Sequence, residues 1–257
     1  IDMARTLLID ADILAYEIAA STEQVLEIDE GYYQTFCDFK EVKRGILERI
    51  EYLTEEYSAD DVKLALTDSI GNFRKSIYPN YKSRRSSVKK PIVLKHTREW
   101  LINERGAYWR PGLEGDDILG ILATHESLVR GERVIFSVDK DLRQIPGLHA
   151  TDGDVVEITE DQAYRFFMVQ TLTGDTTDGY PGLPGYGPKK AESWLDQAVK
   201  VPTKENLWRA VVDAYVRAGF TEEDALVQAR CARILTADLY DFKNKEPILW
   251  TPKAADH

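Results

Sequence analysis

Aspartates end three short apolar runs of the chain, where their carboxylates could hold a metal ion. The runs cover residues 7–10, 62–68 and 134–139, and their last residues are Asp10, Asp68 and Asp139. Each run is rich in Leu, Ile and Val, which is typical of strands buried in a parallel sheet. Ligands of open α/β sheets bind beyond the carboxyl ends of the strands. The sequence therefore predicts that these three carboxylates meet at one edge of a sheet.

More carboxylates stand near these strand ends or in later turns. They are Asp12, Asp141, Asp175, Asp178 and the cluster Glu114-Gly115-Asp116-Asp117. Hard divalent cations such as Mg²⁺ take oxygen ligands, and two of them roughly 4 Å apart can hold the attacking water and the leaving oxygen of a phosphoryl displacement. Crowded acids raise one another's pKa unless cations neutralise them. So many converging acids predict a site for two ions.

Simpler interpretations of single acids exist. An aspartate after a strand is often only the N-cap of the next helix, and Asp116 lies near the start of an expected helix, where a carboxylate is favoured. Asp10-Ala-Asp12 also resembles the nucleophile motif of haloacid-dehalogenase-type phosphatases, and residues 174–178 resemble their metal motif. Ile13 departs mildly from that pattern. Such a phosphatase is an alternative, although its chemistry has no use for the next two features.

The first feature is a basic segment from residue 74 to residue 90, with Tyr78 and Tyr81 among its cations and no acid. Its basic residues are Arg74, Lys75, Lys82, Arg84, Arg85, Lys89 and Lys90. The whole chain is acidic, with a formal net charge of -11. A polyanion that approaches a carboxylate site needs such a positive surface, and aromatic rings can stack on an unpaired base. Otherwise the segment is a solvated basic loop.

The second feature is a glycine-rich turn within residues 174–191. Gly182, Gly185 and Gly187 allow close backbone approach, and Pro188 suits the first turn of a helix. Exposed N–H groups there form an anion site beside Lys189 and Lys190. The turn is predicted to grip a phosphate between two helices, unless it is an ordinary connection between helices.

The remaining pattern indicates an α/β fold followed by helices. Helical periodicity over residues 42–57 and 118–129 separates the apolar runs. After about residue 158 the helical stretches lie near 160–173, 188–196, 204–218 and 222–237. We expect this helical lobe to pack against the sheet as one unit.

Composition limits the class of protein. The chain has 257 residues, 43% of them hydrophobic, which suits a globular fold with a sizeable core. No apolar run approaches the roughly 20 residues that cross a bilayer, and no signal peptide is visible. Only Cys37 and Cys231 are present, so neither a disulfide framework nor a thiolate zinc site is expected. These features favour a cytoplasmic protein that does not bind membranes.

Six motifs, in order, resemble the 5′ nuclease superfamily of flap endonucleases and 5′→3′ exonucleases. They are Leu8-Ile9-Asp10, Thr67-Asp68-Ser69, Tyr81-Lys82 with Arg85, residues 114–117, residues 137–142 and residues 174–191. The match covers most of the chain, and it is most similar to the 5′→3′ exonucleases of T-odd-like short-tailed bacteriophages. This resemblance implies a PIN-like parallel-sheet nuclease core over residues 1–158, with a basic arch or clamp near 74–100. It also implies a helical lobe over residues 159–257, with a helix-three-turn-helix module near 160–196.

The resemblance further implies ligands and roles for individual residues. Two Mg²⁺ ions, which Mn²⁺ can replace, would bind the acids, and K⁺ would bind at the helix-three-turn-helix turn. The first metal ion would be held by Asp10, Asp68, Glu114 and Asp116, and the second by Asp139, Asp141 and Asp178. Asp117 and Asp175 would act through bound waters. Lys82 would stabilise the charge on the scissile phosphate.

The implied activity is that of a 5′→3′ exodeoxyribonuclease with flap endonuclease and RNA-primer removal activity. Its substrates would be double-stranded, flapped or nicked DNA and RNA/DNA hybrid, bound by a monomer. Many relatives carry an arginine in the helix after the first aspartate, where this chain has Glu17, so that role is either vacant or filled by Arg74 or Arg85. The alternatives are the phosphatase, a non-catalytic protein that binds branched DNA, and a PIN-like ribonuclease.

Overall fold

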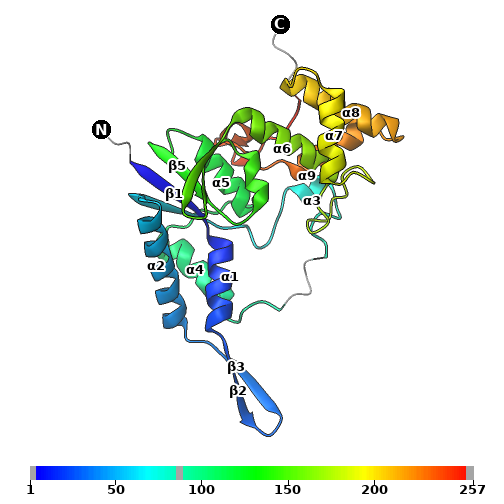
Figure 1. Cartoon of the computed structure of the whole chain (residues 1–257). Helices are drawn as coiled ribbons and strands as arrows, with labels where there is room; N and C mark the ends of the chain where they lie inside the picture. Colours follow the sequence, from blue (N-terminus) through cyan, green and yellow to red (C-terminus); the bar gives the residue numbers. More distant parts are fainter. Residues whose placement is uncertain (1–3, 85–88, 253–257) are drawn as a thin grey trace.

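A five-stranded sheet forms the centre of the protein, whose computed structural model describes residues 4–84 and 89–252 (Figure 1). The strand order is β4-β1-β5-β6-β7, with β1 (Arg5–Asp10), β4 (Asp61–Ala65), β5 (Glu132–Phe136), β6 (Gly147–Thr151) and β7 (Asp154–Ile158). The strands β4, β1, β5 and β6 are parallel, and β7 runs antiparallel to β6.

The three apolar runs form the adjacent strands β4, β1 and β5, as the sequence predicted. Asp10 lies beside Ala65 of β4, and Ile9 lies beside Phe136 of β5. The carboxyl ends of the three strands are therefore nearly level. Residues that follow them emerge at a common edge.

Alternate side chains of β1 enter different cores. Leu7 and Ile9 pack with α1 (Ala11–Thr22), α2 (Phe39–Glu56) and α4 (Leu94–Arg105). Leu8 packs on the other face with α5 (Gly115–Thr124) and the helices of the C-terminal half. Both faces of the sheet are covered, which explains why β1 is apolar without a polar alternation.

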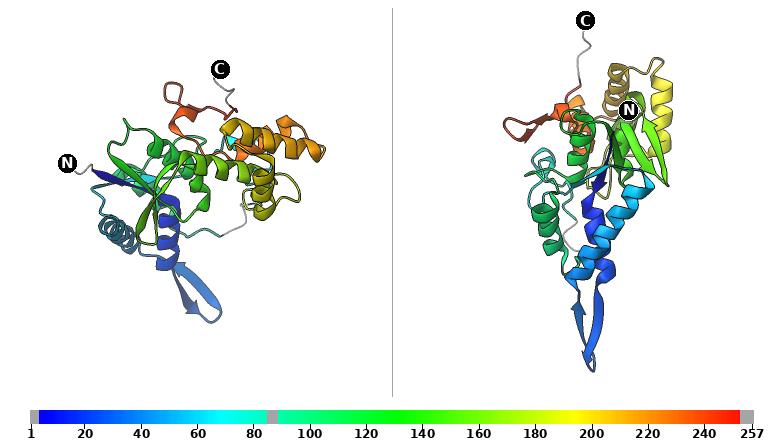
Figure 2. Two further views of the ribbon diagram at one scale, coloured as in Figure 1. Left: turned by 45° about the horizontal axis from the view of Figure 1, so that its top comes forward. Right: turned by 90° about the vertical axis from the view of Figure 1, so that its left-hand side faces the viewer.

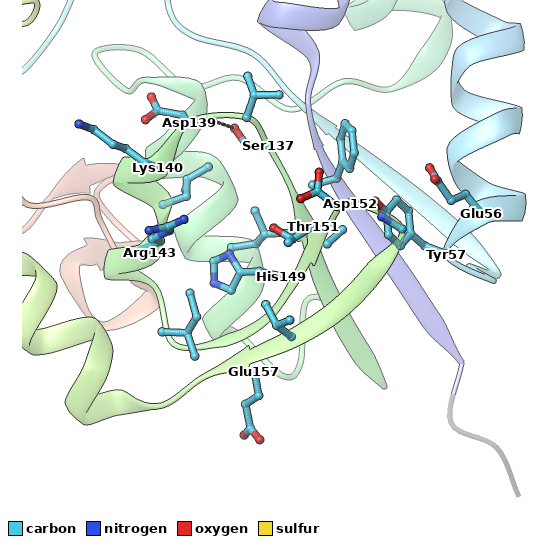
Figure 3. A pocket seen from close by; sticks show the side chains of 18 of the residues that line it. Glu56, Tyr57, Ser137, Asp139, Lys140, Arg143, His149, Thr151, Asp152 and Glu157 are labelled. Carbon is cyan, nitrogen blue, oxygen red and sulfur yellow. Dashed lines mark hydrogen bonds between the residues drawn. The ribbon is translucent and has the colours of Figure 1, made fainter.

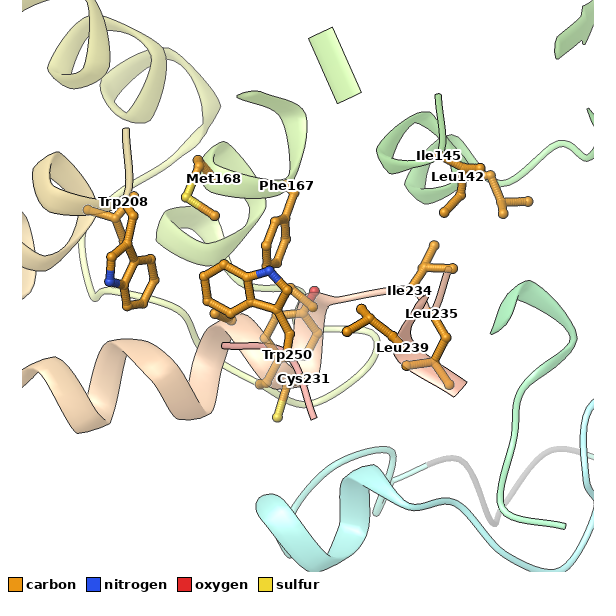
Figure 4. Packing of buried hydrophobic residues seen from close by; sticks show 14 of the residues in the cluster. Leu142, Ile145, Phe167, Met168, Trp208, Cys231, Ile234, Leu235, Leu239 and Trp250 are labelled. Carbon is orange, nitrogen blue, oxygen red and sulfur yellow. The ribbon is translucent and has the colours of Figure 1, made fainter. Parts of the chain in front are cut away.

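The C-terminal half is helical, with α6 (Glu160–Thr173), α7 (Pro188–Ala198), α8 (Lys204–Arg217) and α9 (Glu222–Ala232). Phe167 and Trp208 pack edge-on against Trp250, in a cluster that continues to Leu142 and Ile145 beside the sheet (Figure 4). One hydrophobic core therefore joins the helical half to one face of the sheet.

Two helices end earlier than the sequence predicted. α5 ends at Thr124, and α9 ends at Ala232, five residues before the expected end. After α9 the chain is extended and crosses α5 so closely that a Cβ atom on Gly120 would lie 2.1 Å from the Leu235 carbonyl oxygen. The buried side chain of Arg74 provides hydrogen-bond donors for this part of the backbone. It donates to the carbonyl oxygens of Cys231, near the end of α9, and of Arg233.

Several short elements lack a signal that we recognised in the sequence. The hairpin of β2 (Gln24–Asp29) and β3 (Tyr32–Phe36) projects beyond α1, at the end of the molecule away from α6–α9 (Figures 1 and 2). The others are β6, β7, α3 (Arg74–Ile77), η2 (Lys140–Gln144), η3 (Ala237–Leu239), β8 (Tyr240–Asp241) and β9 (Glu246–Pro247). None of the helices within residues 4–84 and 89–252 combines the length and apolar character needed to cross a membrane.

Candidate metal centre

Carboxylates from distant parts of the chain line one pocket at the carboxyl edge of the sheet. The pocket has a volume of about 360 Å³. Its acidic residues are Asp10, Asp12, Glu114, Asp116, Asp139, Asp141, Asp175 and Asp178, and its basic residues are Lys82 and Lys140. The convergence predicted from the strand ends is therefore present, with Asp68 as the exception.

Local hydrogen bonds fix three of these aspartates. Asp10 caps α1 by accepting from the N–H of Asp12 at 3.0 Å, and Asp139 caps η2 by accepting from the N–H of Asp141 at 2.9 Å. Asp175 accepts from the N–H of Asp178 at 3.1 Å. Each of these bonds uses only the Oδ1 atom of the carboxylate. The N-cap interpretation and the metal-site interpretation are thus compatible, because a second oxygen remains on each residue.

Repulsion and burial raise the pKa of several of these acids. The pKa of Asp10 is raised to about 7 by burial first and by the nearby Asp12 and Asp139 carboxylates second. Burial, together with Asp10 and Asp139, also raises the pKa of Asp116 well above its usual value. The pKa of Asp141 rises to about 6, again through burial and then its acidic neighbours. Bound cations would remove this repulsion.

The donor set fits a hard divalent cation. Asp141, Asp175 and Asp178 each offer a carboxylate oxygen, and these three atoms lie within 4.8 Å of one another. Carboxylate oxygens are the ligands that Mg²⁺ and Mn²⁺ prefer. The pocket can therefore hold divalent metal ions through the chain's own acids.

A buried ion-pair network supports the acids at the start of α5. Arg74, whose side chain is 2% exposed, donates to Glu114 at 2.8 Å and to both oxygens of Asp117. Tyr81 donates its hydroxyl to Glu114 at 2.8 Å. Asp117 does not line the pocket, and its side chain is completely buried.

Lys82 lies at the pocket with its Nζ atom in contact with Glu114 and 3.7 Å from an Asp178 oxygen. Its backbone has a positive φ of 51°. Its N–H donates to the Asp178 carbonyl oxygen at 2.6 Å. The basic segment is therefore tied to the glycine-rich turn through backbone atoms, and this tie places the Lys82 side chain among the acids.

Asp68 does not join the pocket. Its carboxylate accepts from the N–H groups of Ile70, Gly71 and Gly112, at 3.1, 3.2 and 2.8 Å. These bonds lower its pKa, although partial burial opposes them. Strand β4, which precedes Asp68, ends at the expected edge of the sheet. The Asp68 side chain, however, stabilises the loop that follows instead of pointing into the pocket.

The structure also corrects three residues of the expected DNA-binding set. Arg74 and Tyr81 are buried in the network with Glu114, so neither is available to DNA. Gly182 is buried too, and its N–H donates to Gln228 at 2.8 Å. A Cβ atom on Gly182 would lie 2.3 Å from the Gly174 nitrogen, so this glycine is required for packing.

Most of the other expected DNA-binding residues are exposed. They are Lys75, Arg84, Lys89, Lys90, Gly185, Gly187, Lys189 and Lys190. Gly187 is the N-cap of α7, and Lys190 lies with its Nζ atom 4.2 Å from the centre of the Tyr186 ring. Arg85 lies outside the described residues. Glu17 is exposed and does not line the pocket.

Arg98 is a residue near the pocket that sequence reasoning missed. It donates to the Asp12 carboxylate and to the Thr67 carbonyl oxygen, and both of these residues line the pocket. Arg98 lies on α4, 86 positions away from Asp12 along the chain. No motif joins them, so only the packing of α4 beside α1 reveals the pair.

A second, larger cavity of about 910 Å³ adjoins the acidic pocket and shares Asp139 and Lys140 with it (Figure 3). It extends from these residues past Arg143 and His149 toward Tyr57. Strands β5 and β6 pair at only two positions, and the cavity lies where they diverge. It was not anticipated from the sequence.

Several known proteins with related sequences are named as nucleases. Residues 5–170 match the family model described as 5′-3′ exonuclease, N-terminal resolvase-like domain. The exonuclease of Escherichia phage T7 is 32% identical over 281 aligned positions, which cover 96% of this chain and 93% of that protein. The exodeoxyribonuclease of Enterobacteria phage T3 is 31% identical, with the same coverage. A flap endonuclease of Shewanella oneidensis is 29% identical over 48% of this chain and 52% of its own.

Solved structures of bacteriophage T5 proteins share the fold. The T5 5′-exonuclease with bound zinc ions has a TM-score of 0.54 at 15% identity, covering 90% of this chain and 99% of that one. The T5 flap endonuclease in a pseudo-enzyme-product complex with DNA and metal ions has a TM-score of 0.53 at the same identity, covering 89% and 99%. The PIN-like α/β fold predicted from the motifs is confirmed, and the phosphatase alternative is not. From its sequence, its fold and its convergent acids, the chain belongs to the 5′-3′ exonuclease family.

Proposed function

We propose that the chain is a metal-dependent 5′→3′ exonuclease that acts on duplex DNA and releases 5′-phosphorylated products. The observation that carries this proposal is the convergence of eight acids on one pocket at the carboxyl edge of the sheet. Such a set hydrolyses phosphodiester bonds in many enzymes because paired cations activate water and neutralise charge. Flap cleavage and removal of RNA primers from RNA/DNA hybrids are proposed as further activities of the same pocket.

The two metal ions are proposed to be Mg²⁺, with Mn²⁺ as a substitute. Residues proposed for the first ion are Asp10, Glu114 and Asp116, and those for the second are Asp139, Asp141, Asp175 and Asp178. When bound, the ions would activate a water molecule and neutralise the charge that develops on the phosphate. Asp117 is proposed to act through Glu114 and Arg74, since it lies beneath the pocket.

The chain's own residues orient the DNA phosphate. Lys82 is held beside the acids by its backbone bond to Asp178, so its ammonium group can contact a phosphate that enters the pocket. A fixed cation at this point stabilises charge in the transition state without reorganisation. The contact of Lys82 with Glu114 keeps the ammonium group in place before the substrate arrives.

The N-terminus of α7 is proposed to grip the duplex. Gly185 and Gly187 are exposed there, and Lys189 and Lys190 stand in the first turn of the helix. Exposed N–H groups at a helix N-terminus bind phosphate. Helices α6 and α7 with their connecting turn would form the helix-three-turn-helix module, with K⁺ bound at that turn. Lys75, Arg84, Arg85, Lys89 and Lys90 are proposed as further contacts to the DNA backbone.

Cleavage assays test this proposal. The substrates are 5′-labelled duplex, nicked, flapped and RNA/DNA hybrid molecules, incubated with Mg²⁺ and with a chelator. We expect 5′-phosphorylated products only with Mg²⁺, and none from the Asp139→Ala variant, which should still bind DNA. Cleavage by Asp139→Ala comparable with wild type would overturn the metal assignment. We also propose that the protein is a monomer located in the cytoplasm. Sedimentation of the protein and of its DNA complex would test the monomer.

A further inference from the structure

Arg98 joins two pocket residues that lie two positions beyond the ends of the neighbouring strands β1 and β4. Its Nη1 atom donates to Oδ1 of Asp12, and its Nη2 atom donates to the Thr67 carbonyl oxygen. The side chain of Arg98 is 19% exposed and that of Asp12 is 27% exposed. Water and solutes can therefore reach this ion pair, unlike the fully buried pair of Arg74 and Asp117.

Asp12 has a structural bond that does not depend on Arg98. Its Oδ2 atom accepts from the N–H of Thr67 at 2.7 Å, and the Thr67 hydroxyl oxygen accepts from the N–H of Gly115 at 2.8 Å. This chain of bonds connects α1 to the start of α5. Only the Oδ1 atom of Asp12 is used by Arg98, so the ion pair can open while the connection stays.

The charges around the pocket explain why such a pair would be useful. Eight acids line the pocket, and Lys82 already contacts Glu114 and lies near Asp178. Without Arg98, a DNA phosphate that enters on the side of α1 and α4 would meet the Asp12 carboxylate. Arg98 lies on that side, and its charge also contributes to lowering the pKa of Asp68.

We propose that Arg98 is a substrate-binding residue that exchanges Asp12 for a phosphate of the DNA strand in the pocket. Until DNA binds, the Asp12 carboxylate occupies the Nη1 donor of Arg98. When DNA binds, Arg98 keeps its Nη2 bond to the Thr67 carbonyl oxygen, while its remaining N–H groups donate to the phosphate in place of Asp12. Arginine suits this role because its planar group can donate two parallel bonds to phosphate oxygens. The inference rests on the proposed nuclease function.

Variants of the two partners separate this role from a purely structural one. Arg98→Ala should weaken binding of 5′-labelled duplex DNA about tenfold when measured with a chelator, since it removes charged hydrogen bonds to phosphate. It should also reduce the salt slope of binding by about one. Asp12→Asn keeps an oxygen for the Thr67 N–H but frees Arg98, so it should tighten binding about threefold. Arg98→Lys should recover part of the lost affinity.

Arg105→Ala is the matched control, because Arg105 is an exposed arginine at the far end of the same helix. It should leave affinity and salt slope nearly unchanged. Thermal unfolding of every variant confirms that it is folded at the assay temperature.

Each outcome of the binding series has a defined meaning. Equal losses of affinity in Asp12→Asn and Arg98→Ala would show that the pair only holds α4 against α1, and this would overturn the inference. An unchanged affinity and salt slope for Arg98→Ala would do the same. Wild-type protein that cleaves no DNA with Mg²⁺ would instead refute the proposed function, whatever the variants show.

Discussion

The guanidinium of Arg74 donates to both oxygens of the Asp117 carboxylate, at 2.8 and 2.7 Å, with both side chains buried. The same carboxylate accepts from the N–H of Leu235 at 3.0 Å. Arg74 also donates to the carbonyl oxygens of Cys231 and Arg233. This one ion pair therefore joins the basic segment, the helix that carries the acids and the chain that follows α9.

Arg74→Ala should lower the free energy of unfolding by about 3–5 kcal/mol, because it leaves the Asp117 charge buried without its partner. Urea denaturation measures this change. Lys75→Ala, at the exposed neighbouring position, is the control and should change stability by less than about 0.5 kcal/mol. If Arg74→Ala kept full stability and lost only DNA affinity, Arg74 would be a DNA contact after all.

Asp116→Asn should stabilise the metal-free protein and remove cleavage. Burial and the charges of Asp10 and Asp139 raise the pKa of Asp116, so its ionised form is repelled in the folded state. A gain of about 1 kcal/mol would raise Tm by about 2–4 °C for a chain of this size. Thermal unfolding in chelator measures it, with the exposed Asp154→Asn as control. A lower Tm for Asp116→Asn would contradict the predicted repulsion.

Stability without metal should fall as the pH rises from about 4 to 7. Folding raises the pKa of Asp10 from 3.8 to about 7, so between these values the folded protein binds more protons than the unfolded chain. The free energy of unfolding therefore decreases with rising pH across that window. Mg²⁺ should raise Tm more at pH 8 than at pH 5.5, because it binds the ionised carboxylates. Equal Mg²⁺ effects at both pH values would argue against metal binding at Asp10.

Replacing both Lys189 and Lys190 with alanine should weaken duplex binding and flatten its dependence on salt. Two phosphate contacts contribute about 1.8 to the slope of log affinity against log salt concentration. Binding titrations at several salt concentrations measure the slope. Lys204→Ala with Lys243→Ala removes the same charge from exposed positions outside α7. A slope that stays at the wild-type value would refute the gripping role.

Two glycines of the same turn should respond differently to alanine. Gly182→Ala would place a Cβ atom 2.3 Å from the Gly174 nitrogen and 2.6 Å from the Leu172 carbonyl oxygen, so it should destabilise the fold severely. Gly185 has open space around it and a φ of 82°, so Gly185→Ala should cost about 1 kcal/mol of backbone strain. Thermal unfolding compares the two. Similar Tm losses would contradict the close packing at Gly182.

The sequence alone determined three adjacent strands of the sheet, their level carboxyl ends and most of the acidic pocket, whereas β6 and β7 were not predicted. Apolar runs that end in Asp10 and Asp139 have one favourable arrangement, because a strand without polar alternation must be covered on both faces. Parallel strands then bring their carboxyl ends to one edge. Helices α6 and α7 were also predictable, since Pro188 and the glycines before it mark a helix start clearly.

Only the tertiary structure decided the roles of side chains that interact across long distances in the chain. The sequence shows that Arg74 is a cation, but not that it is buried. Its burial depends on its ion pair with Asp117 and on the carbonyl oxygens of Cys231 and Arg233, which lie more than 150 positions away in the chain. Asp68 has a strand-end position like that of Asp10, yet the Gly112 N–H captures its carboxylate. Arg98 reaches Asp12 only because α4 packs beside α1. Hydrophobic periodicity depends on neighbouring residues, so it can be recognised in the sequence. Hydrogen-bond partners that are far apart in the chain are set by the tertiary packing, so they cannot.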